Sequence, residues 1–165
     1  MIHVYTGDGK GKTTAAMGLA ARALGHGKRV VIVQFLKNGK SGELAPLSAA
    51  GATIFSGKAG TKFVSAMTEE EKRATRAMQD EHLRAALALP FDLLILDEAC
   101  AALRYGLLEE ALLRRAVALG KEREIVVTGR DPAPFLLDAA DYITRMECVR
   151  HPFGRGVPAR QGVEY

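Results

Sequence analysis

A glycine- and lysine-rich run between an apolar segment and a helix-forming segment constrains the fold of this chain more than any other feature. The run, residues 6–14, reads TGDGKGKTT and directly follows the apolar residues 2–5. Glycines let the main chain fold into a nest of N–H groups, a lysine adds a mobile positive charge, and a threonine hydroxyl can bind a nucleotide-bound Mg²⁺. The run therefore predicts a phosphate-binding loop between a strand and a helix.

The spacing of this loop departs from the usual pattern at one position. Aligning G-x-x-x-x-G-K-[ST] on Gly11, Lys12 and Thr13 puts Thr6 where the first glycine normally stands. A flexible surface turn rich in glycine and lysine is the alternative interpretation. The strand before the loop and the helix-forming residues 15–24 after it supply the context that a phosphate loop requires. We therefore expect an ATP-type ligand at this loop.

Length and composition limit the class of protein. The chain has 165 residues, 48% of them hydrophobic, which fits a single domain over 1–165 with a sizeable core. No apolar run approaches a membrane span and no export signal is visible, so we expect a cytoplasmic protein without a membrane partner. A net charge of +4 permits nucleic-acid binding, but the basic residues are scattered among acids, so no nucleic acid is expected. Cys100 and Cys148 lack metal-site spacing and are predicted to be buried or inert thiols and not a disulfide or zinc site.

Short β-branched runs alternate with helix-forming segments along the chain. Strands are predicted over 2–5, 29–35, 52–55, 93–96, 124–128 and 142–147. Helices are predicted over 15–24, 68–89, 108–119 and 134–139, with Thr68 as the N-cap of the longest one and Pro90 as its end. This alternation predicts an α/β fold with a mainly parallel sheet of about six strands flanked by helices, the architecture of phosphate-loop (RecA-like) NTPases.

Polar residues follow several of the predicted strands and should meet at one edge of the sheet. The phosphate loop, residues 34–37, Asp97 with Glu98, and residues 128–130 all lie at the carboxyl ends of strands, where ligands of open α/β sheets bind. Carboxylates at the end of a buried strand are typical Mg²⁺ ligands, directly or through water. Glu98 is either a general base or a metal ligand, and the sequence does not separate these roles.

Several other residues are weaker candidates for ligand contacts. Lys37, Lys62, Arg22 and Arg130 could bind phosphate or substrate, but such residues more often face solvent, and only Arg130 gains weight from its position after a strand. Phe63 lies in a glycine- and lysine-rich loop, where packing beneath the loop is favoured over contact with a flat ligand.

The last segment, residues 151–165, shows neither helical nor strand periodicity and is rich in glycine, proline and arginine. A frayed terminus is one interpretation. A tail that folds across the edge of the sheet and contacts a ligand or a partner subunit is the other. Residue types alone do not decide between the two.

Taken together, these motifs resemble the phosphate-loop type of ATP:corrinoid adenosyltransferases. The resemblance covers residues 6–16 and 20–28, continues through 33–37, 96–98 and 128–130, and ends with the tail over 151–165. The loop alone is unspecific. Its combination with Gly-His-Gly-Lys at 25–28 and Gln-Gly-Val-Glu-Tyr at 161–165 is a narrow signature that spans nearly the whole chain.

The resemblance implies transfer of the 5′-deoxyadenosyl group from ATP to the Co(I) of a reduced corrinoid, with release of triphosphate. Such an enzyme presents C5′ of ATP to cobalt and stabilises charge on the departing triphosphate. Members of the family bind ATP in the opposite sense to other phosphate-loop enzymes, with the γ-phosphate where others place the α-phosphate, which leaves C5′ exposed.

The resemblance also implies roles for individual residues. Lys12 is the implied catalytic residue, Thr13 and Glu98 are the implied ligands of Mg²⁺ or Mn²⁺, and Asp97 lies outside the metal shell. Further implied contacts to ATP or corrinoid are Gly7, Asp8, Gly9, Lys10, Gly11, Thr14, Arg22, Phe63 and Arg130. A homodimer and a reductase or flavodoxin-like electron donor are implied partners.

This sequence departs from the family in two respects. Well-known members carry a longer N-terminal helical segment, whereas this sequence begins at the first strand. They also use a Phe and a Trp, in the loop corresponding to residues 60–64, to displace the lower ligand of cobalt. The present chain has no Trp, and Phe63 is the only aromatic residue there. Losing an axial ligand makes cob(II) easier to reduce, so a chain with one aromatic is expected to handle the corrinoid less efficiently or to prefer a precursor.

Two other functions fit the phosphate loop itself. An ordinary phosphate-loop ATPase or small-molecule kinase would use Glu98 as base or metal ligand and would release phosphate or ADP. A nucleotide-switched binding module would bind ATP tightly without turning over a corrinoid. Neither alternative accounts for the tail, so adenosyl transfer is the leading hypothesis.

Overall fold

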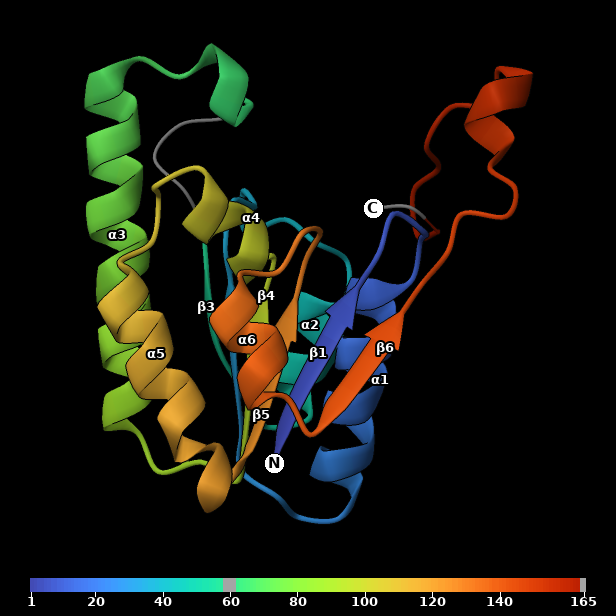
Figure 1. Cartoon of the computed structure of the whole chain (residues 1–165). Coiled ribbons are helices and arrows are strands. Elements are labelled where there is room, and N and C mark those ends of the chain that lie inside the picture. Colours follow the sequence, from blue (N-terminus) through green and yellow to red (C-terminus); the bar gives the residue numbers. More distant parts are fainter. Residues whose placement is uncertain (58–61, 164–165) are drawn as a thin grey trace.

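A parallel sheet forms the centre of the structure (Figure 1), a computed structural model that describes residues 1–57 and 62–163. Within these residues six strands pair in the order β3-β2-β4-β5-β1-β6, and every pair is parallel. The predicted α/β fold is therefore confirmed. The strands are Ile2–Thr6 (β1), Val30–Gln34 (β2), Thr53–Ser56 (β3), Leu93–Asp97 (β4), Glu124–Thr128 (β5) and Tyr142–Arg145 (β6).

Helices cover both faces of the sheet. One face packs against α1 and α2, and the other packs against α3, α4, α5 and α6. The helices are Lys12–Gly25 (α1), Leu44–Ala49 (α2), Glu69–Ala88 (α3), Ala99–Arg104 (α4), Glu110–Ala118 (α5) and Pro134–Ala139 (α6). Short 3₁₀ turns occur at Val64–Ala66 (η1), Leu119–Lys121 (η2) and Pro152–Arg155 (η3). Among the described residues, no helix has the length and apolar character needed to cross a bilayer.

The central strands are apolar along most of their length because both of their faces are buried, and a polar residue stands at the carboxyl end of each. In β2, Val31 and Val33 belong to the core under α3 to α6, whereas Val30 and Ile32 belong to the core under α1 and α2. The same alternation recurs in β4 and β5, as expected when successive side chains point to opposite faces. Continuous apolar runs in the sequence thus reflect two cores, one on each side of the sheet.

The longest helix begins where the sequence predicts. The hydroxyl of Thr68 accepts a hydrogen bond from the N–H of Glu71 at 3.2 Å, and the Glu71 carboxylate accepts one from the N–H of Thr68 at 2.7 Å. This reciprocal capping box satisfies two N–H groups that the first turn leaves unpaired. The short helices α2 and α4 carry no comparable signal and were not predicted.

Strand order brings the functional segments to one edge of the sheet. The phosphate loop leaves β1, and the strand that ends in Asp97 is separated from β1 only by β5. Among the residues that the structure describes, three other than glycine have positive φ angles, namely Leu36 at 60°, Glu98 at 62° and Asp131 at 50°. Each of them follows the carboxyl end of a strand. Such backbone conformations are costly for these residue types and concentrate at functional sites.

Candidate active site

The phosphate loop wraps around the side chain of its own lysine. Gly11 has a φ of 116° and precedes the first turn of α1, a conformation that favours glycine. Lys12 is the first residue of the helix and is only 8% exposed. Its Nζ atom donates hydrogen bonds to the carbonyl oxygens of Gly7, at 2.8 Å, and Gly9, at 2.6 Å. The loop therefore holds a positive charge at the start of α1.

The charges around Lys12 favour an anion as its partner in place of the two loop carbonyl oxygens. Burial, followed by repulsion from Arg130, lowers the pKa of Lys12, while Glu98 and Asp8 oppose this effect. The Arg130 guanidinium itself donates to the carbonyl oxygen of Asp8 at 3.2 Å. Two cations thus lie against one loop, and a polyphosphate would relieve their repulsion.

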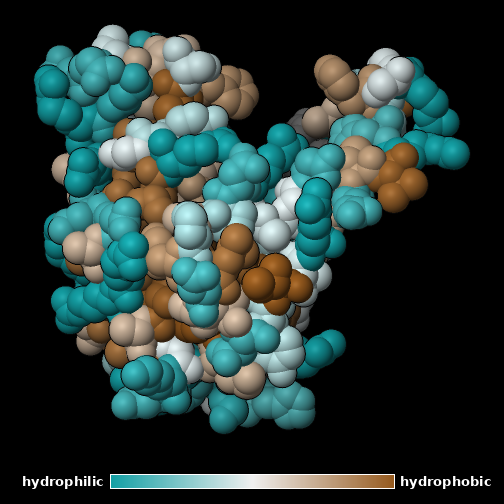
Figure 2. All heavy atoms as spheres, in the orientation of Figure 1, coloured by the Kyte–Doolittle hydropathy of each residue, from teal (hydrophilic) through white to brown (hydrophobic). Residues whose placement is uncertain are grey.

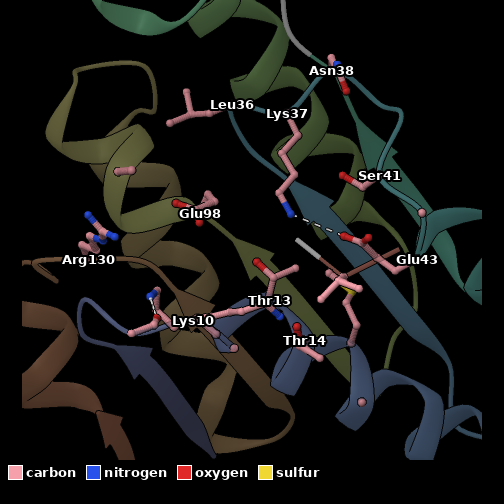
Figure 3. A pocket seen from close by; sticks show the side chains of 18 of the residues that line it. Lys10, Thr13, Thr14, Leu36, Lys37, Asn38, Ser41, Glu43, Glu98 and Arg130 are labelled. Carbon is pink, nitrogen blue, oxygen red and sulfur yellow. Dashed lines mark hydrogen bonds and ion pairs between the residues drawn. The ribbon is translucent and has the colours of Figure 1, made fainter. Parts of the chain in front are cut away.

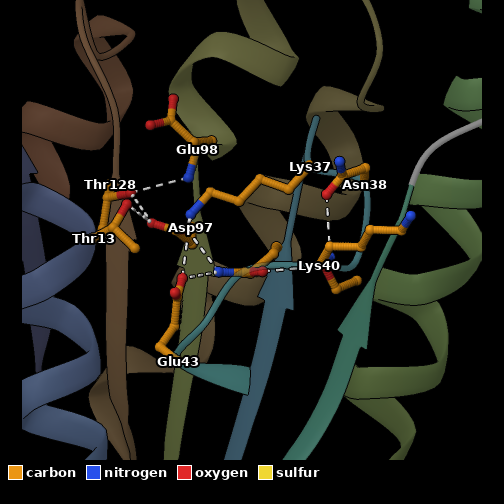
Figure 4. A network of polar contacts seen from close by, with 10 residues as sticks. Thr13, Lys37, Asn38, Lys40, Glu43, Asp97, Glu98 and Thr128 are labelled. Carbon is orange, nitrogen blue, oxygen red and sulfur yellow. Dashed lines mark hydrogen bonds and ion pairs between the residues drawn. The ribbon is translucent and has the colours of Figure 1, made fainter. Parts of the chain in front are cut away.

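A buried carboxylate connects this loop to the centre of the sheet (Figure 4). Asp97 is 0% exposed, and its Oδ1 atom accepts hydrogen bonds from the hydroxyls of Thr13 and Thr128, both at 2.8 Å. Its Oδ2 atom accepts from Nζ of Lys37 at 2.8 Å and from the amide of Gln34 at 3.3 Å. A buried carboxylate is tolerated only with such compensation. Asp97 therefore positions the hydroxyl of Thr13 and does not itself face the cavity.

The loop after β2 completes this polar network. Gln34 is also 0% exposed, and its amide donates to Glu43 at 2.8 Å while its carbonyl oxygen accepts from Ser56 at 3.1 Å. Glu43 lies 3.5 Å from Nζ of Lys37. Lys37 thus lies between two carboxylates, one buried and one at the cavity wall. Sequence reasoning treated Lys37 as a weak phosphate contact and gave no signal for these pairings.

Glu98 occupies the position next to Asp97 with its carboxylate directed toward the cavity (Figure 3). Its φ of 62° turns the chain sharply from β4 into α4, and its N–H donates to the hydroxyl of Thr128 at 2.9 Å. Burial, and next the charge of Asp97, raises the pKa of Glu98 above the ordinary glutamate range. The site thus holds a carboxylate that a cation would stabilise.

The raised pKa leads to a prediction for Glu98→Gln. Because the ionised form is disfavoured in the folded state, the stability that protonated Glu98 contributes is lost as the pH rises through its raised pKa. We expect Glu98→Gln to exceed the parent protein in free energy of unfolding at about pH 8, and the difference to shrink as the pH is lowered to about 5. Denaturant titrations across this range in metal-free buffer measure it. A difference that does not vary with pH would contradict the assignment.

A large cavity opens above the loop and joins most of these segments. Its volume is about 2450 Å³, well above the roughly 300–1,000 Å³ that is typical of a site for one small ligand. The phosphate loop and Glu98 line its base, the loop after β2 and α2 line one wall, and η1 and the C-terminal tail also border it. The space is sufficient for a nucleotide together with a second, larger molecule.

Most of the site residues expected from the sequence meet at this cavity. Those that line it are Asp8, Gly9, Lys10, Gly11, Lys12, Thr13, Thr14, Phe63, Glu98 and Arg130. Gly7 and Arg22 are not among the lining residues. The carbonyl of Gly7 instead bonds Lys12, and Arg22 is exposed on α1. Contact of Arg22 with a nucleotide therefore stays a prediction that the geometry of the cavity does not support.

Phe63 does not pack beneath its loop as residue type alone favoured. Its side chain is 83% exposed and lines the cavity just before η1. Residues 58–61 of the predicted glycine- and lysine-rich loop, and residues 164 and 165 of the tail motif, lie outside the described residues. Five residues of the C-terminal segment also line the cavity, although the sequence assigned none of them an individual ligand contact: Cys148, His151, Phe153, Gly162 and Val163.

The oxygen donors at the base of the cavity fit Mg²⁺ bound together with a polyphosphate. Mg²⁺ prefers hard oxygen ligands and is usually held by one or two carboxylates plus phosphates and water. Glu98 supplies a carboxylate, Thr13 supplies a hydroxyl, and both line the same cavity. Within 1–57 and 62–163, no three His, Cys, Asp or Glu side chains gather into a metal cage. A cation at this position would need phosphate oxygens and water to complete its ligand shell.

Comparison with known proteins assigns the chain to a family. The profile of the ATP:corrinoid adenosyltransferase BtuR/CobO/CobP family matches residues 1–165. Two corrinoid adenosyltransferases, from Pseudomonas aeruginosa and Salmonella typhimurium, are 36% identical to this chain, and one from Escherichia coli is 33% identical. Each alignment includes the whole of this chain and 83%, 85% and 85% of the respective relative. The chain therefore belongs to the ATP:corrinoid adenosyltransferase family.

Proposed function

We propose that the cavity transfers the 5′-deoxyadenosyl group of ATP to the Co(I) of a reduced corrinoid. The observation that carries the proposal is a phosphate loop at the base of a cavity of about 2450 Å³, large enough for two substrates, in a member of this family. In the reaction an electron pair of Co(I) forms the cobalt–C5′ bond. The C5′–O bond breaks, and its electron pair leaves with triphosphate.

Lys12 and Arg130 are the cations that we expect to act on the triphosphate. The ammonium group of Lys12 exchanges its two loop carbonyls for phosphate oxygens, and the guanidinium of Arg130 leaves the carbonyl of Asp8 for the same ligand. Both groups are held in place before the reaction, so they stabilise the negative charge that develops as C5′–O breaks without a large reorganisation. This preorganised charge is the main catalytic contribution assigned to the protein.

Thr13 and Glu98 are the residues that would hold Mg²⁺, or Mn²⁺ in its place. When bound, the cation neutralises part of the charge on the triphosphate oxygens. The Thr13 hydroxyl donates its proton to Asp97, which leaves its lone pairs available to bind the cation. Asp97 therefore acts through Thr13, which agrees with a position outside the metal shell.

Adenosyl transfer does not require a general base, because Co(I) is already a strong nucleophile and carries no proton to remove. The role of Glu98 is thus metal binding and not activation of water. This separates the proposal from an ordinary ATPase or kinase, in which a carboxylate at this position orients or deprotonates the attacking group.

The proposal also includes a corrinoid contact, an electron donor, an oligomeric state and a cellular compartment. Phe63 contacts the corrinoid, and its replacement by Ala is expected to slow the reaction of cob(II) more than that of chemically prepared cob(I). A reductase or flavodoxin-like protein supplies the electron that forms Co(I). The protein acts as a homodimer in the cytoplasm.

An anaerobic assay with chemically reduced cob(I)alamin, ATP and Mg²⁺ tests the proposed function. The expected products are a light-sensitive alkylcobalamin, visible by its absorption spectrum, and inorganic triphosphate in equal amount. Accumulation of ADP or phosphate while the cobalt spectrum stays unchanged would replace the proposal with the ATPase or kinase alternative. Tight ATP binding with neither product would favour a nucleotide-switched binding module.

A further inference from the structure

The C-terminal tail, residues 146–163, is fastened to the phosphate loop at its base. The N–H of Met146 donates to the carbonyl oxygen of Thr6, and the N–H of Gly9 donates to the carbonyl oxygen of Met146, both at 2.8 Å. The N–H of Cys148 donates to the carboxylate of Asp8 at 3.3 Å. The tail therefore continues the parallel pairing of β6 with β1 directly onto the loop.

Two glycines of the loop make this close approach feasible. A Cβ atom on Gly9 would lie 2.7 Å from the carbonyl carbon of Glu147, and one on Gly7 would collide with the carbonyl oxygen of Met146. Any larger residue would push the tail away from the loop. The glycines thus allow both a phosphate nest and the attachment of the tail, and residues 146–148 are ordered against the loop.

Beyond this attachment the tail projects from the body and forms a short capped turn. Nδ1 of His151 accepts a hydrogen bond from the N–H of Phe153 at 3.2 Å, Pro152 is the first residue of η3, and Gly156, with a φ of 75°, ends it. The turn presents Phe153 with 76% of its surface exposed. An exposed aromatic side chain is not in itself a sign of a ligand contact, so its position relative to the cavity decides its role.

Phe153 borders the same cavity as the phosphate loop. His151 and Phe153 line it from the tail, and Phe63 and Val64 line it from the segment at η1. In Figure 1 the tail, in red, and η1, in green, lie on opposite sides of the molecule beyond the carboxyl ends of the strands, and Figure 2 shows a notch in the surface between them. The cavity thus has the phosphate loop as its floor and two separate walls that carry exposed aromatic residues.

We propose that the tail forms one wall of the corrinoid subsite and that Phe153 contacts the corrin macrocycle directly. The inference rests on the proposed function and adds to it a second wall, distant in sequence from Phe63. A corrinoid is a broad, largely apolar ring system with polar groups at its edge, which suits a wide site with aromatic walls. Because Met146 and Cys148 are hydrogen-bonded to the loop, the base of this wall lies next to the proposed triphosphate site.

Phe153→Ala in the full-length protein tests the proposal, with Val149→Ala as a matched control. Val149 is an apolar residue of the same tail, 92% exposed, and is not among the residues that line the cavity. Calorimetric titration of the ATP-loaded protein with cob(II)alamin measures the Kd of the corrinoid, a parallel titration measures the Kd of ATP, and initial rates with cob(I)alamin give KM and kcat.

We expect Phe153→Ala to raise the Kd and KM for the corrinoid at least about tenfold while the Kd for ATP changes less than about twofold. Phe153→Tyr should restore corrinoid binding, and Val149→Ala should behave like the parent protein. The thermal midpoint of Phe153→Ala should match that of the parent, because so exposed a side chain contributes little to packing.

Three outcomes would overturn the proposal. The first is an unchanged corrinoid Kd in Phe153→Ala. The second is an equal loss of ATP binding, which would make the tail a support for the phosphate loop. The third is a changed oligomeric state with unchanged corrinoid affinity, which would make Phe153 a contact between two copies of the chain. Failure of the proposed function is distinguishable, because then the parent protein itself would form no adenosylcorrinoid.

Discussion

Lys12→Ala is expected to lower kcat for adenosyl transfer by about 10²- to 10³-fold, the usual loss when one preorganised group that stabilises developing charge is removed. The Lys12 ammonium lies at the floor of the cavity between two loop carbonyls, and no large movement is needed to bring it onto a phosphate oxygen. The negative charge on triphosphate increases as the C5′–O bond breaks, so the interaction is stronger in the transition state than in the bound substrate.

Folding stability separates this catalytic effect from a structural one. Burial lowers the pKa of Lys12, which means that the folded protein holds the charged form at a cost. The thermal midpoint of Lys12→Ala should therefore equal or exceed that of the parent. Lys12→Arg should not restore kcat, because the planar guanidinium does not fit a pocket shaped for a compact ammonium.

Lys28→Ala provides a control for the loss of one positive charge. Lys28 is exposed just beyond the opposite end of α1 and should show parental kcat. Anaerobic initial rates with saturating ATP and cob(I)alamin measure the effect. A Lys12→Ala enzyme within tenfold of the parent would show that the loop amides and metal suffice for the leaving triphosphate.

Asp97→Ala is expected to have the second large effect, on stability and turnover together. The substitution removes the acceptor of four hydrogen bonds from a position with no exposure to solvent, and it leaves the hydroxyls of Thr13 and Thr128 and the amide of Gln34 without this partner. Breaking a buried ion pair from one side typically costs about 3–5 kcal/mol. Lys37 is 24% exposed and can turn to Glu43, so we expect a loss near 3 kcal/mol.

The loss of activity in Asp97→Ala should follow from misorientation of Thr13. With Asp97 removed, the threonine hydroxyl is free to rotate, and the affinity for Mg²⁺ in the presence of ATP should fall about 10- to 100-fold, as is usual when a partner of a metal ligand is removed. Denaturant unfolding and a Mg²⁺ titration of ATP binding measure the two effects. Asp92→Ala, which breaks an ion pair with Arg29 at the protein surface, should change stability far less. Equal effects of the two substitutions would contradict the role of the buried network.

Local sequence patterns predicted the fold and the floor of the site well. Continuous β-branched and leucine-rich runs located the strands to within two residues, because a parallel strand buried on both faces is apolar along most of its length. The carboxyl ends of parallel strands share one edge of the sheet, so the convergence of the phosphate loop, Glu98 and Arg130 followed from their positions after strands.

Features that depend on contacts between distant segments could not be predicted in this way. The pairing of Lys37 with Asp97 joins residues 60 positions apart, and an isolated lysine after a strand gives no sign of such a partner. The exposure of Phe63 likewise depends on where η1 stands relative to the cavity, whereas residue type alone favours burial. Helices as short as α2 and α4 show too few turns for a periodic pattern.

The tail illustrates the same limit most clearly. Its composition is compatible with a frayed end or a ligand contact, and only the hydrogen bonds between Met146 and Gly9 and between Cys148 and Asp8 show that its base is ordered against the loop. Phosphate loops use glycine to form the nest of N–H groups. Here Gly7 and Gly9 also leave space for a second segment of chain, a requirement that becomes visible only in three dimensions.

The most direct test of the central claim is to follow an ¹⁸O label at the oxygen that joins C5′ of ATP to the α-phosphate during turnover with cob(I)alamin. Adenosyl transfer breaks the C5′–O bond, so mass spectrometry should find the label entirely in the released triphosphate, with one triphosphate formed per alkylcobalamin. A label that remains on the adenosine moiety, in ADP or AMP, would show that a P–O bond breaks instead, and the protein would then act as a phosphoryl- or nucleotidyl-transfer enzyme.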